Sequence, residues 1–382
     1  MKRIINRITA TISLFLLVGA VASSTVAMAG GIDVIWVGGG WHVGEVPLSD
    51  VVDYVAITGD GATPFQNLYA ARVDGGIDEF WVDGSVWRKG TIPVGVDTLY
   101  IDLAADSSAP QMLYGLRATG GIDVIWVGGG WRIGAVPGSE GTTYVAITGD
   151  GATPFQNLYA ARVDGGIDEF YVDGGVWRKG GLPVGVDTLY IDLAADSSAP
   201  QMLYGLRATG GIDVIWVGGG WHIDEVPLSD VVDYVAITGD GATLFQNLYA
   251  ARIDGGVDEF WVEGGWRKGT IPVTTATYIG LAADVSAPQM IYGLKAPDED
   301  GDGIPDESDE CLGTLSGDVV DANGCSIAQH CPADSLYKNH GEYVSCVAHI
   351  AEVFLNAGLI TDAEKDDIVS AAAKSDIGKP RK

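Results

Sequence analysis

Arginine, glutamate and tryptophan side chains recur at matching positions along this chain. An arginine beside aromatic residues can hold a pair of sugar hydroxyls by hydrogen bonds, while an indole stacks on the apolar face of the sugar. The candidate ligand-binding residues are Arg72, Glu79, Trp81, Arg117, Trp126, Arg162, Glu169, Arg207, Trp216, Arg252, Glu259 and Trp261. These residue types favour a shallow carbohydrate pocket that repeats around the molecule.

The arginines also have a purely structural interpretation. If the hairpin loop is Gly75-Gly76, Arg72 lies across from Glu79 on the next strand. Cross-strand pairs of opposite charge are common and add only about 0.2–1 kcal/mol each. The equivalent pairs would be Arg162 with Glu169 and Arg252 with Glu259, whereas Arg117 and Arg207 would face Val124 and Val214. The two arginines without an acidic partner are therefore the better candidates for ligand contact.

A second set of residues could bind a metal ion. Five aspartates between Asp298 and Asp309 occupy positions 1, 3, 5, 9 and 12 of a loop that has Gly303 at position 6. Ca²⁺ takes about 6–8 oxygen ligands, and alternate carboxylates on a tight loop supply them. The expected ligands are Asp298, Asp300, Asp302, the carbonyl of Ile304, Asp306 and Asp309. The alternative is an acidic linker that binds nothing.

The elements that carry the first set belong to a repeat of 45 residues. Related segments, in two alternating versions, begin at Gly30, Gly75, Gly120, Gly165, Gly210 and Gly255. Each repeat holds four short runs separated by Gly, Pro and Asp turns, which is typical of strands. In the second repeat these runs are Ile77–Val82, Trp87–Ile92, Thr98–Leu103 and Leu113–Arg117. Four strands in a repeat of this length indicate a β-propeller blade.

The predicted fold class is therefore all-β, a six-bladed β-propeller over residues 30–297. The repeat region begins with two strand-like runs and ends with the other two. We expect the N-terminal strands to complete a blade with the C-terminal strands and so close the ring. Because most blades carry a tryptophan at the same two positions, we expect many of these indoles to pack between blades.

The segment LYAARVDGGIDEFWVDGSVWRKG, residues 68–90, resembles the blades of bacterial and fungal fucose-binding propeller lectins, and more loosely those of tachylectin and tectonin propellers. The resemblance covers residues 30–296. It implies sugar sites between adjacent blades, formed by residues such as Arg72, Glu79 and Trp81. It also implies a binding protein that is not an enzyme. The alternatives are a protein-binding or adhesion scaffold at the bacterial cell surface and a propeller enzyme whose site is not recognisable.

The remaining chain differs in composition. Residues 298–325 resemble a thrombospondin type 3 repeat, which implies a calcium-binding linker. All cysteines follow the ring, and an even number in an exported chain predicts disulfides. Sequential pairing closes short loops and would join Cys311 with Cys325 and Cys331 with Cys346. A zinc site of Cys331, Cys346, His340 and His349 is the alternative.

Residues 326–382 are expected to form a helical hairpin. One helix is predicted over Gly341–Leu359, and a capping box at Thr361–Glu364 predicts a second helix that runs to about Lys374. This part resembles a small C-terminal module of secreted bacterial proteins.

Residues 1–29 have the features of a secretory signal peptide that is cleaved after Ala29. This predicts a secreted, periplasmic or cell-surface protein with no transmembrane segment in the mature chain. The net charge of −29 disfavours nucleic acid as a ligand. We expect a monomer that binds Ca²⁺ and either glycans or cell-surface proteins.

Overall fold

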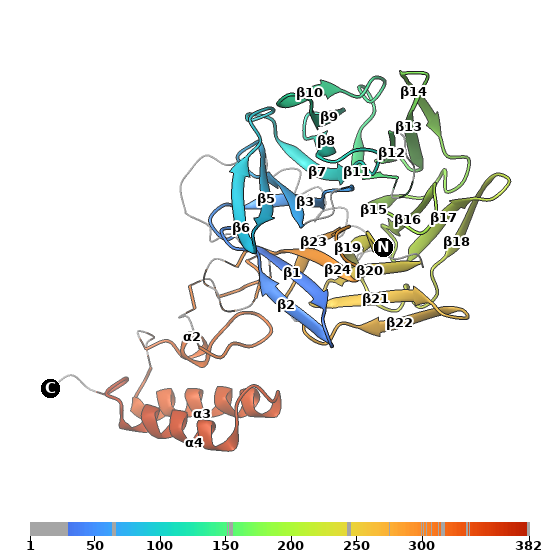
Figure 1. Ribbon diagram of the computed structural model, residues 1–382. Coiled ribbons are helices and arrows are strands. Elements are labelled where there is room, and N and C mark those ends of the chain that lie inside the picture. The colour runs from blue at the N-terminus through green and yellow to red at the C-terminus, as the bar shows by residue number, and fades with distance from the viewer. Residues whose placement is uncertain are drawn as a thin grey trace. The chain divides into compact units, whose positions relative to one another are not determined.

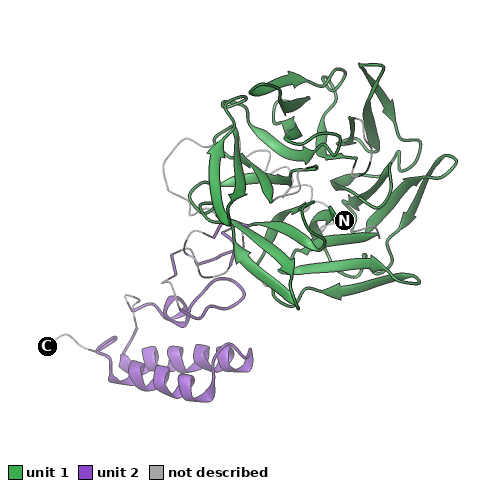
Figure 2. Ribbon diagram, in the orientation of Figure 1, with its two compact units in different colours: residues 1–295 green, residues 296–382 purple. Residues whose placement is uncertain are grey.

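The computed structural model describes residues 30–379, apart from 63–65, 151, 153–155, 243–245, 275, 299, 301, 303, 307, 312, 315–317, 334 and 336. The predicted signal peptide lies outside the described residues. The chain divides into two compact units, residues 1–295 and residues 296–382 (Figure 2). In the described part of the chain, no helix is both long enough and apolar enough to cross a bilayer.

The first unit is a ring of six antiparallel sheets of four strands each (Figure 1). Blade 1 contains β3 (Tyr54–Gly59), β4 (Asn67–Arg72), β5 (Ile77–Asp83) and β6 (Val86–Thr91). Blade 2 contains β7 (Tyr100–Ala105), β8 (Met112–Arg117), β9 (Ile122–Val127) and β10 (Trp131–Ala135). Blade 3 contains β11 (Tyr144–Gly149), β12 (Asn157–Arg162), β13 (Ile167–Asp173) and β14 (Val176–Gly181).

The other three blades repeat this order. Blade 4 contains β15 (Tyr190–Ala195), β16 (Met202–Arg207), β17 (Ile212–Val217) and β18 (Trp221–Glu225). Blade 5 contains β19 (Tyr234–Gly239), β20 (Asn247–Arg252), β21 (Val257–Val262) and β22 (Trp266–Thr270). Blade 6 contains β23 (Tyr278–Ala283), β24 (Met290–Lys295), β1 (Ile32–Val37) and β2 (Trp41–Glu45). The all-β six-bladed propeller is thus confirmed.

Blade 6 closes the ring as predicted. Its strands lie in the order β2-β1-β24-β23, so the first two strands of the ring pair with the last two. Ile32 is opposite Leu294 in this ladder, and the Tyr278 hydroxyl donates to Asp33 Oδ2 over 2.7 Å. The closure leaves neither β1 nor β24 with an open hydrogen-bonding edge.

The core lies between blades. Each outermost strand has a tryptophan at its first position, or at its second position in β6 and β14. This tryptophan packs edge to face against a tyrosine of the neighbouring blade, with ring centroids 6.0–6.4 Å apart. The pairs are Trp41–Tyr249, Trp87–Tyr292, Trp131–Tyr69, Trp177–Tyr114, Trp221–Tyr159 and Trp266–Tyr204. The prediction that indoles pack between blades is confirmed for this set.

The second unit contains α2 (Ile327–His330), α3 (His340–Asn356) and α4 (Asp362–Lys374). Thr361 and Glu364 form the predicted capping box of α4. The two predicted disulfides, Cys311–Cys325 and Cys331–Cys346, are both present. The zinc alternative is therefore wrong, because both of its cysteines are disulfide-bonded. The short helix α2 was not predicted, since four residues are too few to show a helical period.

Candidate ligand-binding clusters between the blades

The hairpin between β4 and β5 does not have the predicted register. Arg72 N donates to Gly76 O over 3.1 Å, so the loop is Val73-Asp74-Gly75 and Arg72 is opposite Gly76. Glu79 is opposite Tyr69. The related hairpins have the same register. The predicted pairs of Arg72 with Glu79, Arg162 with Glu169 and Arg252 with Glu259 are therefore wrong.

The register also separates Arg72 from Glu79 and Trp81. Successive side chains of a strand point to opposite faces of the sheet, and directly opposed residues share a face. Glu79 and Trp81 consequently lie on one face of blade 1, and Arg72 lies on the other. There Arg72 pairs with Asp74 at 2.6 Å and with buried Asp78 at 3.7 Å. The three candidates do not form one site.

Arg117 and Arg207, which belong to the other version of the repeat, are also paired with acidic residues. Arg117 pairs with Glu140 and, at 3.7 Å, with Asp123. Arg207 lies 2.9 Å from Asp213 and 2.5 Å from Glu225. The prediction that these two arginines lack acidic partners is wrong. Asp123 and Asp213 lie diagonally across on the adjacent strand, on the same face of the sheet as the arginine. Glu140 follows the outermost strand β10, and Glu225 ends the outermost strand β18.

A different set of predicted residues does come together between blades 1 and 2. Glu79 Oε1 accepts hydrogen bonds from Asn67 Nδ2 at 3.2 Å, Gln111 Nε2 at 3.4 Å and the Tyr69 hydroxyl at 3.5 Å. Trp81 is directly opposite Asn67, and Trp131 packs on Tyr69 from blade 2. We call each group of Asn, Glu, Gln and two aromatic residues a glutamate cluster. The three clusters are Asn67, Glu79, Trp81, Gln111, Trp131; Asn157, Glu169, Tyr171, Gln201, Trp221; and Asn247, Glu259, Trp261, Gln289, Trp41.

Each glutamate cluster contains a buried acceptor with no partner. Asn67 is 4% exposed, and its Oδ1 receives no hydrogen bond from any described residue. The same holds for Asn157 and Asn247. An unsatisfied buried acceptor costs about 1–3 kcal/mol, so a donor supplied from outside the chain would be favoured there.

The glutamate cluster between blades 1 and 2 has two further features. Burial raises the pKa of Glu79, although hydrogen bonds from Asn67 and Gln111 oppose the shift. Gln111, like Gln201 and Gln289, has a φ of 53°, which is costly for a residue with a side chain. Its backbone is held in place by a 2.7 Å hydrogen bond from Gln111 N to Asp60 Oδ2.

The other three interfaces between blades have apolar residues at the same positions. Between blades 4 and 5, Met202 and Val214 replace the asparagine and the glutamate, next to Trp216. The Gln246 amide contacts Met202 Sδ at 3.2 Å. We call these groups methionine clusters: Met202, Val214, Trp216, Gln246, Trp266; Met112, Val124, Trp126, Gln156, Trp177; and Met290, Val34, Trp36, Gln66, Trp87. Predicted residues Trp126 and Trp216 thus belong to a second class of interface.

Sequence reasoning missed a set of basic residues on the outermost strands. Arg88 is directly opposite Trp81, and its side chain is 55% exposed. The other members, each opposite the aromatic residue of its blade, are His42, Arg132, Arg178, His222 and Arg267. The sequence did contain a signal for this set, because each of these residues directly follows the tryptophan of the second strand-like run in its repeat.

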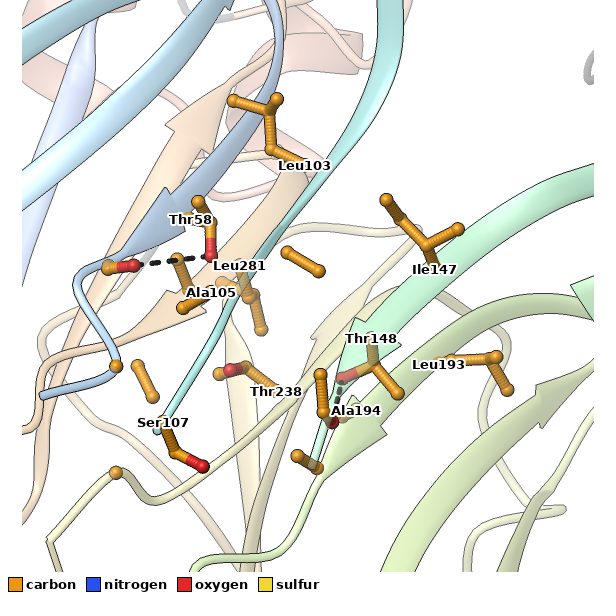
Figure 3. Close-up of a pocket in the computed structure, with 18 of the residues that line it drawn as sticks. Thr58, Leu103, Ala105, Ser107, Ile147, Thr148, Leu193, Ala194, Thr238 and Leu281 are labelled. Carbon is orange, nitrogen blue, oxygen red and sulfur yellow. Dashed lines mark hydrogen bonds between the residues drawn. The ribbon is translucent and has the colours of Figure 1, made fainter. Parts of the chain in front are cut away.

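The innermost strands surround a central pocket of about 120 Å³ (Figure 3). Thr58, Thr148 and Thr238 lie around it, as do Asp102 and Asp192. Asp192 accepts backbone hydrogen bonds from Leu193 and from Ile237 of the next blade. Burial raises the pKa of Asp192 to about 7, and burial followed by the Asp192 charge raises that of Asp102.

The acidic loop of the second unit brings several predicted ligands together. Carboxylate oxygens of Asp298, Asp300 and Asp302 all lie within 4.8 Å of one another. Asp302 Oδ2 is buried and has no partner among the described residues. The pKa of Asp309 is raised, first by burial and then by the charges of Asp302, Asp300 and Asp306. The candidate ligand atoms are all oxygens, and one of them has no hydrogen-bond partner among the described residues. Such a set fits a hard cation such as Ca²⁺.

No family model and no curated protein matches the chain. Among solved structures, it is similar to a fungal lectin of Aleuria aurantia, described as a six-bladed β-propeller with a novel fucose recognition mode, at 16% identity over 66% of this chain and 99% of that chain, with a TM-score of 0.45. It is similar to a lectin of Burkholderia pseudomallei at 19% identity over 71% and 92% of the two chains, with a TM-score of 0.49. A third similar structure is AofleA of Arthrobotrys oligospora, at 16% identity over 61% and 76%, with a TM-score of 0.45. These similarities do not identify the ligand of this chain, which is therefore inferred from its own residues.

Proposed function

We propose that the ring is a non-enzymatic carbohydrate-binding module and that the three glutamate clusters are its sugar sites. A carboxylate and two amides beside aromatic rings match a sugar, which offers hydroxyl donors and acceptors on its edges and an apolar face for stacking. The observation that carries the proposal is the repetition of this set in three places, each with the same unpartnered asparagine oxygen.

In this assignment, the three arginines that share a blade with these glutamates have a structural role and do not contact the sugar. Arg72, Arg162 and Arg252 are held by acidic residues on the opposite face from the glutamates. The described hydrogen bonds to Glu79 all end on Oε1, which leaves Oε2 for a ligand hydroxyl. Each site should be weak, with a dissociation constant from about millimolar to micromolar. Three sites on one rigid ring would raise avidity on a glycan-coated surface by about 10²–10⁴.

A glycan array tests the proposal. The variant Glu79→Gln/Glu169→Gln/Glu259→Gln keeps the shape of the clusters and removes their charge. We expect it to lose glycan binding while its melting temperature stays close to that of the wild type. The matched control, Met112→Leu/Met202→Leu/Met290→Leu, changes the other three interfaces and should still bind. If no glycan binds the wild type, while a surface protein binds it regardless of free sugar, the ring is a protein-binding scaffold instead.

We also propose that the thrombospondin-like segment 298–325 binds Ca²⁺ and that the protein is exported. Asp298, Asp300, Asp302, Asp306, Asp309 and the Ile304 carbonyl would be the ligands. Support comes from the converging carboxylates and from the two disulfides, which persist in oxidising compartments. Mass spectrometry of the exported protein tests the second point, because a mature chain beginning at Gly30 is expected.

A further inference from the structure

The interface between blades 4 and 5 contains a cavity of about 460 Å³. Trp216, Trp266 and Met202 are among the residues that line it. Asp224 and Glu225, from the outermost strand β18, complete its wall, and no Lys or Arg is among the described residues that line it. Among the described residues, the lining therefore combines aromatic and acidic side chains without a basic one.

Asp224 distinguishes this cavity from the two related interfaces. The residue at the same place is Gly44 in β2 and Gly134 in β10, each opposite the valine of its own cluster, as Asp224 is opposite Val214. Among the three methionine clusters, the one between blades 4 and 5 alone has a carboxylate at this position.

The two carboxylates of the cavity differ in their availability. Glu225 is paired with Arg207 at 2.5 Å, so its charge is already compensated. Asp224 is exposed and forms no ion pair with any described residue, and its Oδ1 accepts a hydrogen bond from Glu225 N at 2.9 Å. His222 stacks on Trp216 and bonds Gly218 O, and it does not line the cavity. One uncompensated negative charge thus lines a cavity that two tryptophans also line.

We propose that this cavity binds an alkylated ammonium group, such as the trimethylammonium group of choline. Indole faces attract cations, and they do so most strongly when the cation is weakly hydrated and partly desolvated. Methyl groups on nitrogen fit the apolar walls, and Asp224 supplies the counter-charge. The net charge of −29 favours the approach of a cation. This site is separate from the glutamate clusters and does not depend on them.

Calorimetric titration of the full-length protein with choline chloride tests the site. We expect one site per chain and a dissociation constant that rises at least about tenfold in Asp224→Gly, which recreates the residue of the two sister interfaces. The neutral carbon isostere of choline, with a tert-butyl group in place of trimethylammonium, should bind the wild type correspondingly weakly. Phosphatidylcholine vesicles in a parallel sedimentation assay tell whether the group is presented on a lipid headgroup or on a free solute.

A gain-of-site variant is the matched control. Gly44→Asp places a carboxylate in the interface between blades 6 and 1, where a Cβ would meet Trp36 at an ordinary 3.4 Å. This variant should bind two choline molecules per chain. The proposal is overturned if choline does not bind, if the neutral isostere binds as tightly, or if Asp224→Gly binds choline unchanged. Asp224→Gly should keep its glycan binding, so failure of this site and failure of the sugar sites are distinguishable.

Discussion

At the scale of single residues, one aspartate in each blade organises the side chains around it. Asp78 accepts from the Tyr54 hydroxyl at 2.7 Å and from Thr91 Oγ1 at 2.7 Å, and it pairs with Lys89 at 3.1 Å. The equivalents in the other blades are Asp33, Asp123, Asp168, Asp213 and Asp258. Basic residues near these aspartates therefore stabilise the fold.

The first prediction concerns Arg117. Replacing it with alanine removes a cation from buried Asp123 and should lower the free energy of unfolding by about 1–3 kcal/mol. Arg132→Ala, on the exposed outer strand of the same blade, should change it by less than about 0.5 kcal/mol. Urea unfolding of both variants measures the difference. Equal stability of the two would contradict the structural role of Arg117.

The second prediction concerns pH. An unfolded aspartate has a pKa of about 3.9, whereas that of folded Asp192 is about 7. The folded state therefore binds more protons than the unfolded state between these values. This contribution to the free energy of unfolding is full below about pH 4 and is lost as the pH rises through 7, with a slope of up to about 1.4 kcal/mol per pH unit.

Asp192→Asn removes the titrating group, so the wild type should lose stability relative to this variant as the pH rises from 4 to 7. Urea unfolding across this range measures the difference in slope. Parallel pH profiles for the two proteins would show that Asp192 does not titrate as argued.

The arginines also show where sequence reasoning ends. A Gly-Gly pair in a hairpin permits more than one loop, and each loop gives a different register. The positive φ angles of Gly75 and Gly76, 105° and 82°, select the loop that makes Arg72 face Gly76. Glu79, Trp81 and their counterparts could be selected from the sequence. Gln111 could not, because it belongs to the next blade, and Asn67 could not, because it lies opposite Trp81 only in the observed register.

At the scale of elements, the blade boundaries followed closely from the repeat. The runs predicted over Ile77–Val82 and Leu113–Arg117 match β5 and β8 to within one residue. The run predicted from Thr98 begins at Tyr100 instead, because Thr98 N closes a turn by donating to Gly95 O. Strand identity depends on composition, which the sequence contains, whereas strand ends depend on turn hydrogen bonds.

The third prediction concerns the closure of blade 6. Deleting residues 30–46 removes β1 and β2, exposes the β24 edge and leaves Tyr278 without Asp33. We expect the remaining chain to lose its cooperative thermal transition and to bind a hydrophobic dye. Deleting residues 298–382 is the control, because the ring core contains none of those residues. A cooperative transition after the first deletion would mean that the closure is dispensable.

At the scale of the whole molecule, the chain combines a ring of alternating interfaces with a small disulfide-bonded unit. The super-repeat of 90 residues makes the glutamate and methionine clusters alternate, so the ring presents two chemically different sets of three. Multivalent attachment to a surface uses such repetition, because several weak contacts act together.

The fourth prediction concerns calcium. Asp300→Ala/Asp302→Ala removes two of the three converging carboxylates and should abolish Ca²⁺ uptake in calorimetry, without changing the melting temperature of the ring. Removing Ca²⁺ from the wild type with a chelator should make residues 298–309 more susceptible to proteolysis. Uptake of one Ca²⁺ by the double variant would place the ion elsewhere.

The most direct test of the central claim is the number of sugar molecules bound per chain. Native mass spectrometry with a glycan selected on the array should show up to three bound copies on the wild type, one for each glutamate cluster. The variant Glu79→Gln/Glu169→Gln/Glu259→Gln should show none, and the single variant Glu79→Gln should show two. Six copies on the wild type, or three on the triple variant, would contradict the assignment of the sugar sites to the glutamate clusters.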